Sequence, residues 1–155
     1  MSLSPLAAYA LQAFDAVVAA DVGFRDRPGQ RQMAEQVART FAEAALGKAD
    51  DDAAEPVRSI AVIQAGTGVG KSLAYCVPAI ALALARHTRV LISTATVALQ
   101  EQLVNKDLPA LAAQMPQPFR FALAKGRGRY VCKLKLNRVA GGPADGDDDL
   151  FEDEE

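Results

Sequence analysis

Residues 65–72 combine the residue types and the spacing of a phosphate-binding loop. They read Ala-Gly-Thr-Gly-Val-Gly-Lys-Ser, with glycine at every second position from 66 to 70. Glycine adopts backbone angles that are closed to other residues, so amide N–H groups can approach phosphate oxygens closely. We expect Lys71 to reach the β- and γ-phosphates and Ser72 to offer its hydroxyl to Mg²⁺, as the two catalytic residues. The residues expected to bind a nucleoside triphosphate are Ala65, Gly66, Thr67, Gly68, Val69, Gly70, Lys71 and Ser72.

A phosphate-binding loop of this kind lies between a strand and a helix. Residues 59–63 form an apolar run rich in β-branched side chains, which predicts a strand buried on both faces. Residues 71–86 are rich in alanine and leucine and predict a helix, whose N-terminus favours a bound anion. Further strands are expected at 89–93 and 119–123, separated by broken helical residues. This alternation predicts an α/β fold with a doubly wound parallel sheet.

Two helices are expected before the sheet. The first covers about residues 5–20, and the second begins at Pro28 and ends near Gly47. The apolar stripe expected on the second helix is Met33, Val37, Phe41 and Ala45. We therefore expect N-terminal helices over 1–47 and a polar linker over 48–58.

Charge is divided unevenly along the chain. Residues 145–155 hold eight of the 19 acidic residues, which leaves 17 basic and 11 acidic residues, a net charge of +6, in 1–144. A basic body with an acidic tail, which is expected to be disordered, is compatible with a polyanionic partner. Charge alone slightly favours the alternative of an ordinary solvated face. The two cysteines lie far apart and no apolar run could span a bilayer, so a cytoplasmic protein is expected.

Several segments resemble superfamily 2 helicases. Residues 65–72, with alanine first, are similar to motif I; 24–33 is similar to the adenine-reading Q motif, and 92–103 to motif Ia. Residues 106–109 and 125–132 are similar to the DinG branch of the XPD-like helicases. The resemblance covers about residues 24–136. It implies a RecA-like P-loop NTPase and an ATP-dependent DNA helicase that moves 5′ to 3′ and acts in DNA repair.

The resemblance assigns roles to further residues. Gln30 would hydrogen-bond the adenine of ATP with Arg27 and Phe24 nearby; otherwise Gln30 is an exposed helix residue. Thr94 and Thr96 would contact single-stranded or forked DNA, although Thr96 also suits a helix N-cap with Leu99 and Leu103 facing the core. The remaining residues expected to contact nucleic acid are Lys125, Arg127, Arg129 and Tyr130. Packing of Tyr130 under the loop is the alternative.

The resemblance divides the rest of the chain into an incomplete first motor domain over 59–131, the start of an iron–sulfur insertion over 132–144 and the acidic tail over 145–155. Cys132 matches the first of four cysteines that hold a [4Fe–4S] cluster in the family. Cys76 is the only other cysteine and is expected to be a core residue, so only a longer chain could hold the cluster.

No Asp-Glu-x-His or Asp-Glu-x-Asp segment follows residue 72. Helicases use this acidic pair to hold Mg²⁺ and to orient the attacking water. We therefore expect a monomer that binds ATP and nucleic acid weakly without efficient hydrolysis. A non-catalytic nucleotide-binding remnant and a small P-loop kinase or ATPase are the alternatives.

Overall fold

The computed structural model describes residues 2–20, 27–45 and 56–140, apart from the side chain of Arg127. The chain divides into two compact units, Met1–Ala122 and Leu123–Glu155. Phe24, Gly47 and the acidic tail lie outside the described residues. Among the helices within these ranges, none has the length and hydropathy needed to cross a membrane.

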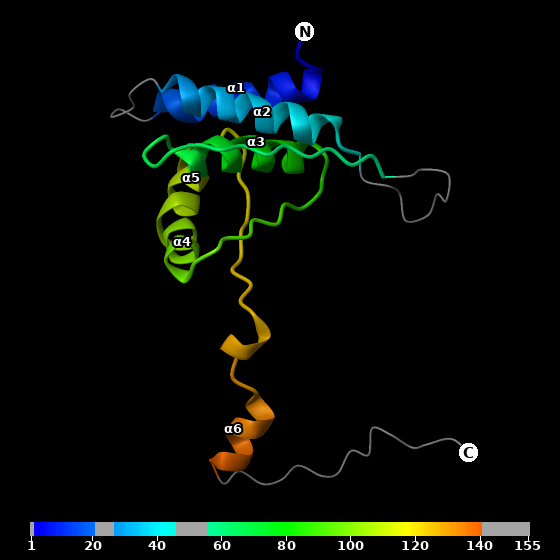
Figure 1. The fold of residues 1–155 in the computed structure, drawn as a ribbon. Coiled ribbons are helices and arrows are strands. Elements are labelled where there is room, and N and C mark those ends of the chain that lie inside the picture. Colours follow the sequence, from blue (N-terminus) through cyan, green and yellow to red (C-terminus); the bar gives the residue numbers. More distant parts are fainter. Residues whose placement is uncertain (1, 21–26, 46–55, 141–155) are drawn as a thin grey trace, which may run out of the picture. The chain divides into compact units, whose positions relative to one another are not determined.

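Three helices form the core of the first unit: α1 (Pro5–Ala20), α2 (Pro28–Glu43) and α3 (Lys71–Ala85) (Figure 1). All three were expected, although α2 ends before the predicted Gly47. Small side chains such as Ala10, Ala34 and Ala74 are fully buried where the helices meet, which allows their backbones to lie close together. Phe14 and Val77 fill the space between them.

The predicted apolar stripe of α2 is only partly correct. Val37 is buried, but Phe41 is 41% exposed and Ala45 is exposed. The buried face is instead formed by residues that are mostly small or polar, namely Gln30, Ala34, Val37, Ala38 and Thr40. Close packing against neighbouring helices selects small residues here, a preference that hydrophobic periodicity does not reveal.

A second helical segment follows residue 96. It consists of α4 (Val97–Gln102), a π-helical turn η1 (Leu103–Asp107) and α5 (Leu108–Gln114). Leu103, Leu108 and Leu111 are buried in the core, whereas Leu99, which was also expected there, is 46% exposed. In the second unit the 3₁₀ turn η2 (Arg127–Arg129) precedes the short helix α6 (Lys133–Val139).

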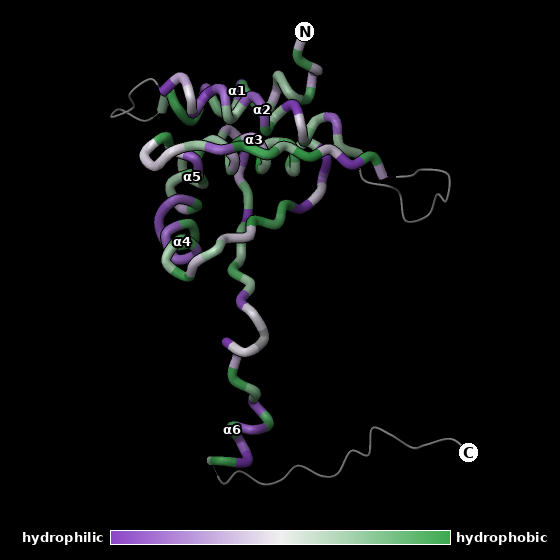
Figure 2. The backbone as a smooth tube through the Cα atoms, viewed as in Figure 1, coloured by the Kyte–Doolittle hydropathy of each residue, from purple (hydrophilic) through white to green (hydrophobic). Residues whose placement is uncertain are grey.

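None of the three predicted strands pairs with a neighbour in the part of the chain that the structure describes. Residues 59–63, 89–93 and 119–123 carry no strand assignment, and the only backbone pairing outside helices and turns there is an isolated antiparallel bridge between Ala45 and Val57. The hydrophobic segment before α3 is visible in Figure 2. Its Ile60 and Val62 are 85% and 95% exposed.

The predicted parallel sheet is therefore not observed in these residues, which are helical or irregular. The physical reason is that a strand has no hydrogen bonds of its own and is stabilised only by pairing and by burial of both faces. Apolar pattern and β-branching indicate that a segment suits a strand, but they do not supply the pairing partner.

Candidate nucleotide-binding site

The loop of residues 65–70 runs directly into the first turn of α3. Gly68 and Gly70 have φ angles of 82° and 85°, in the left-handed region where a side chain costs about 1–2 kcal/mol. Gly70 is the N-cap of α3, and no side chain caps the helix there. The N-terminal amides of α3 therefore remain available to an anion, as the sequence predicts for a phosphate site.

Lys71 folds back across its own loop. Its Nζ donates hydrogen bonds to the carbonyl oxygens of Ala65 at 3.1 Å and Gly66 at 2.8 Å. The ammonium group is thus held over the loop, where phosphate oxygens would replace the carbonyls as its acceptors. Ser72 is half-buried in the first turn of α3, directly after Lys71, and its side chain interacts with Tyr75 one turn further along the helix.

The N-terminus of α2 contacts the same loop. Gln30 Nε2 donates to the carbonyl oxygen of Gly70 at 2.9 Å, and Arg27 donates from its guanidinium to the carbonyl of Gly68 at 3.0 Å. Arg27 is the extended N-cap residue of α2 and Pro28 opens the helix. The structure therefore brings together the two segments that the sequence assigned to nucleotide binding.

Gln30 is buried, which rules out the alternative of an ordinary exposed helix residue. It is only 3% exposed, and its Oε1 is buried without a hydrogen-bond partner. An unsatisfied buried acceptor is costly, about 1–3 kcal/mol, unless a ligand donates to it. The exocyclic amino group of adenine is a donor of this kind, but it can reach Oε1 only if the Gln30 side chain moves to expose that atom.

The fit to Mg²⁺ is partial. Ser72 could supply one oxygen ligand, but the described residues hold no group of three or more His, Cys, Asp or Glu side chains that could bind a metal. The fit to an iron–sulfur cluster fails, because the chain has two cysteines where four thiolates are needed. Cys76 is fully buried in α3, as expected for a core residue, and Cys132 is exposed.

The two threonines predicted to contact DNA lie at the start of α4. Thr96 is the N-cap, with Oγ1 accepting from the backbone N–H of Leu99 at 3.2 Å. Thr94 donates from Oγ1 to the carbonyl of Thr96, also at 3.2 Å. The capping role of Thr96 is observed, and its exposed position leaves DNA contact as a prediction.

In the second unit, the basic side chains that the structure describes are exposed, namely those of Lys125, Arg129, Lys133, Lys135 and Arg138. The backbone N–H of Lys125 donates to the hydroxyl of Tyr130 at 2.9 Å, which closes a loop around η2. Tyr130 as a whole remains 58% exposed, and the preceding residue Arg129 is also exposed. Tyr130 therefore closes the loop through its hydroxyl while presenting its ring, so neither of the two predicted roles excludes the other.

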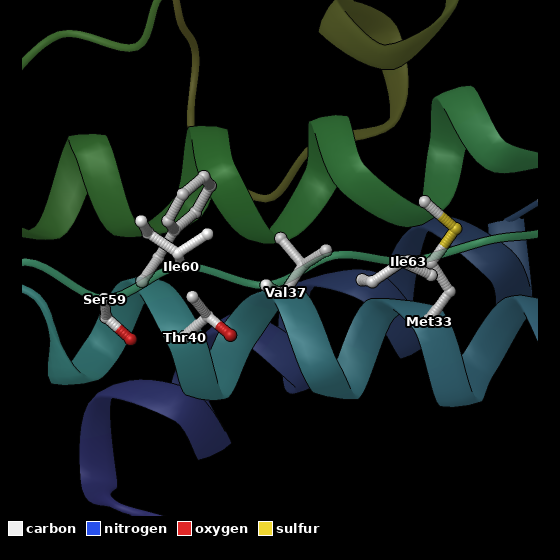
Figure 3. A pocket seen from close by; sticks show the side chains of 8 residues that line it. Met33, Val37, Thr40, Ser59, Ile60 and Ile63 are labelled. Carbon is white, nitrogen blue, oxygen red and sulfur yellow. The ribbon is translucent and has the colours of Figure 1, made fainter.

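An apolar groove of about 400 Å³ lies between α2 and residues 59–63 (Figure 3). Met33, Val37 and Ile63 line it from the two sides. None of the P-loop residues 65–72 contributes to its lining, so we do not assign the groove to the nucleotide.

Sequence reasoning missed one residue of this arrangement, Arg86. It follows α3 and hydrogen-bonds three backbone carbonyls at the end of α2. The partners are more than 40 residues away in the chain, and no local pattern signals such a contact.

Comparison with known proteins agrees with these features. Residues 48–115 match the family model of the DEAD/DEAH box helicases. The chain is similar to the ATP-dependent DNA helicase DinG of Photobacterium profundum, with 60% identity over 73 residues, 47% of this chain and 10% of the relative. It is similar to the ATP-dependent helicase DinG of Mycobacterium tuberculosis, with 44% identity over 126 residues, 79% of this chain and 17% of the relative. The DinG of Salmonella choleraesuis is 45% identical over 117 residues, 76% of this chain and 15% of the relative.

Proposed function

We propose that this chain, which matches the DEAD/DEAH box helicase model and resembles DinG helicases, carries the ATP site of a DinG-type helicase at its P-loop and Gln30. Membership of this class implies a RecA-like P-loop fold. The chain spans 10–17% of the length of the curated relatives named above. The proposal rests on the 2.9 Å hydrogen bond that joins Gln30 to the P-loop residue Gly70.

In this proposal the phosphates and the base are held by different elements. Lys71 exchanges its two carbonyl acceptors for phosphate oxygens, and the amides around Gly68 and Gly70 donate to the same phosphates. Gln30 turns to expose Oε1, which then accepts from the adenine amino group and so gains the partner it lacks. Mg²⁺, when bound, neutralises phosphate charge, and Ser72 offers it a hydroxyl.

We propose nucleic-acid contact at two further places. Thr94 and Thr96 offer hydroxyls at the start of α4, and Lys125, Arg127 and Arg129 carry positive charge along an acid-free segment. Such contacts bind phosphates without reading sequence, and an exposed ring such as Tyr130 can stack on a base. The proposed partner is single-stranded or forked DNA, because the relatives are named DNA helicases.

We also propose that residues 59–63 and 89–93 are strands of a parallel sheet. Residues 59–63 and 89–93 are apolar, irregular and unpaired, with Val62 95% and Leu91 89% exposed. A parallel strand without neighbouring strands or covering helices is expected to have unpaired backbone groups and exposed apolar side chains. Their place before and after α3 is that of the two strands that flank a P-loop helix.

We propose 5′-to-3′ DNA unwinding, in DNA repair and in the cytoplasm, as the process in which this ATP site takes part. The 155 residues themselves contain no Asp-Glu-x-His or Asp-Glu-x-Asp segment to orient the attacking water. Phosphoryl transfer depends on such positioning, so these residues alone are expected to bind ATP without efficient turnover.

Titration of the chain with a fluorescent ATP analogue and Mg²⁺ tests the proposal. Lys71→Ala is expected to weaken binding about tenfold or more, since charge-assisted hydrogen bonds contribute about 1.5–3 kcal/mol. Lys106→Ala is the matched control, because Lys106 is an exposed lysine on η1. Equal affinity of Lys71→Ala and Lys106→Ala would contradict the proposal. DNA-stimulated ATP hydrolysis that Lys71→Ala abolishes would contradict the expected lack of turnover.

A further inference from the structure

Arg86 holds the C-terminal end of α2. Its guanidinium donates to the backbone carbonyls of Phe41 at 2.8 Å, Ala42 at 2.7 Å and Ala44 at 2.8 Å. The last carbonyls of a helix have no N–H partner within the helix and carry partial negative charge. A planar group that stays charged at all accessible pH values can satisfy several of them together. Arg86 is half-buried, so solvent competes only partly for these bonds.

The opposite end of α2 holds the P-loop. There Gln30 bonds Gly70 and Arg27 bonds Gly68, immediately before α3 begins at Lys71. The two helices therefore run in the same direction and are joined by polar contacts at both ends. Helix α3 connects Lys71 to Arg86 without a break, and α2 connects Gln30 to the carbonyls that Arg86 binds. Each helix is about 23 Å long at 1.5 Å per residue.

Between its ends, α2 presents mainly small side chains to the core, with Val37 as the largest buried apolar one. Ala34 and Ala38 are fully buried there and offer little side chain to interlock with a neighbouring helix. An ion pair between Arg31 and Asp15 also holds α2, but both side chains are about half exposed, which weakens such a pair. The polar contacts at its two ends therefore add to this packing in fixing the axial position of α2.

We propose that Arg86 is a positioning residue for base recognition: it fixes α2 along α3 and thereby fixes Gln30 over the P-loop. This inference rests on the proposed role of Gln30 in adenine recognition. A shift of α2 moves the Gln30 amide relative to the base but leaves Lys71 and the phosphate-binding amides on α3 in place. Loss of the Arg86 contacts should therefore reduce discrimination between bases more than it reduces affinity for the triphosphate.

The test compares the dissociation constants of ATP and GTP for the full 155-residue chain and its variants. The measured quantity is the dissociation constant of GTP divided by that of ATP. Arg86→Ala is expected to lower this ratio at least about threefold, toward the ratio of Gln30→Ala. Arg86→Lys should give an intermediate ratio, because an ammonium lacks the planar fork that reaches three carbonyls. Arg39→Ala is the control: Arg39 lies on α2 but hydrogen-bonds Glu35 of the same helix, so the ratio should not change.

The outcomes separate this inference from the proposed function. An unchanged ratio in Arg86→Ala, or equal weakening of ATP and GTP, overturns the positioning role when Gln30→Ala does lower the ratio. If Arg86→Ala does not fold, a wild-type ratio in Arg86→Lys overturns it instead. A ratio that Gln30→Ala leaves unchanged overturns adenine recognition and the inference together.

Discussion

Gln30 and Gly70 meet through a hydrogen bond of 2.9 Å although 40 residues separate them in the chain. The bond uses the donor of the Gln30 amide and leaves its acceptor buried and unpartnered. A Cβ at 70 would lie 2.9 Å from Gln30 Cδ and closer still to Nε2, so a larger residue there would displace the Gln30 amide. One contact thus links the start of α2, the P-loop and the start of α3.

Gly70→Ala should destabilise the chain more than Gly68→Ala. Both glycines have a positive φ, so each substitution introduces similar backbone strain, about 1–2 kcal/mol. A Cβ at 68 meets nothing within 4 Å, whereas a Cβ at 70 displaces the buried Gln30 amide. Chemical denaturation measures the two free energies of unfolding, and we expect a further loss of about 1 kcal/mol or more for Gly70→Ala.

The double variant Gly70→Ala with Gln30→Ala isolates this clash. Removing the long side chain should make Gly70→Ala no more destabilising than Gly68→Ala, giving a coupling energy of about 0.5–3 kcal/mol between the two sites. If the two substitutions lower the free energy of unfolding additively, the proposed clash between a Cβ at 70 and the Gln30 side chain is refuted.

Cys76 should make stability fall at high pH. Burial, and secondarily the charge of Asp107, raises the pKa of this thiol from 9.0 to about 12. Between these values the unfolded chain loses the proton and the folded chain keeps it. The free energy of unfolding should therefore decrease by up to about 1.4 kcal/mol per pH unit from pH 9 to pH 12.

Comparison of two alanine variants checks this dependence. Cys76→Ala should flatten the decline measured by denaturation across that pH range, leaving the part due to Tyr75, whose pKa burial also raises. Cys132→Ala, at an exposed cysteine, should leave the decline unchanged. A decline of equal steepness in Cys76→Ala and the parent chain would be evidence against the buried thiol.

Thr96→Ala should cost about 1 kcal/mol, the usual contribution of an N-cap side chain. The hydroxyl of Thr96 accepts from the Leu99 N–H, and Thr96→Ser keeps that bond. Serine should restore both stability and any DNA affinity that alanine removes. If Thr96→Ser restores stability but not DNA affinity, capping and DNA binding are separate, and the threonine methyl group contributes to DNA binding.

Binding of single-stranded DNA should depend on salt through the basic segment of the second unit. Each phosphate contact contributes about 0.7 to the slope of log affinity against log salt, so replacing Lys125 and Arg129 by alanine should reduce it by about 1.4. Arg39→Ala, which breaks a pair with Glu35 on α2, serves as the control and should leave the slope unchanged. An identical slope in the double variant and the control would exclude these two residues from the contact.

The helices and the loop were accessible from the sequence because their signals are local. Pro28 marks the start of α2, and the glycines of 65–70 give way to the alanine- and leucine-rich α3. The strands at 59–63 and 89–93 were predicted but are not observed, because pairing is a property of neighbouring segments and not of the strand alone.

For the candidate site, the sequence proposes which residues take part but not how they contact one another. Family resemblance placed Gln30 and the P-loop in one site, yet only the structure shows that the Gln30 amide bonds the loop itself. The three bonds from Arg86 to α2 had no sequence signal, because arginine after a helix is common and its acceptors are backbone atoms. Polar contacts between distant segments depend on how the helices pack, which periodicity does not specify.

The central claim is that the P-loop and Gln30 together form an adenine-nucleotide site, and competition between ATP and GTP for the full chain tests it most directly. We expect ATP to bind several-fold more tightly than GTP, since one hydrogen bond to the base contributes about 1 kcal/mol. Gln30→Ala should remove that preference while Lys71→Ala weakens both nucleotides together. Equal affinity of the parent chain for ATP and GTP, or a preference that persists in Gln30→Ala, would contradict the account.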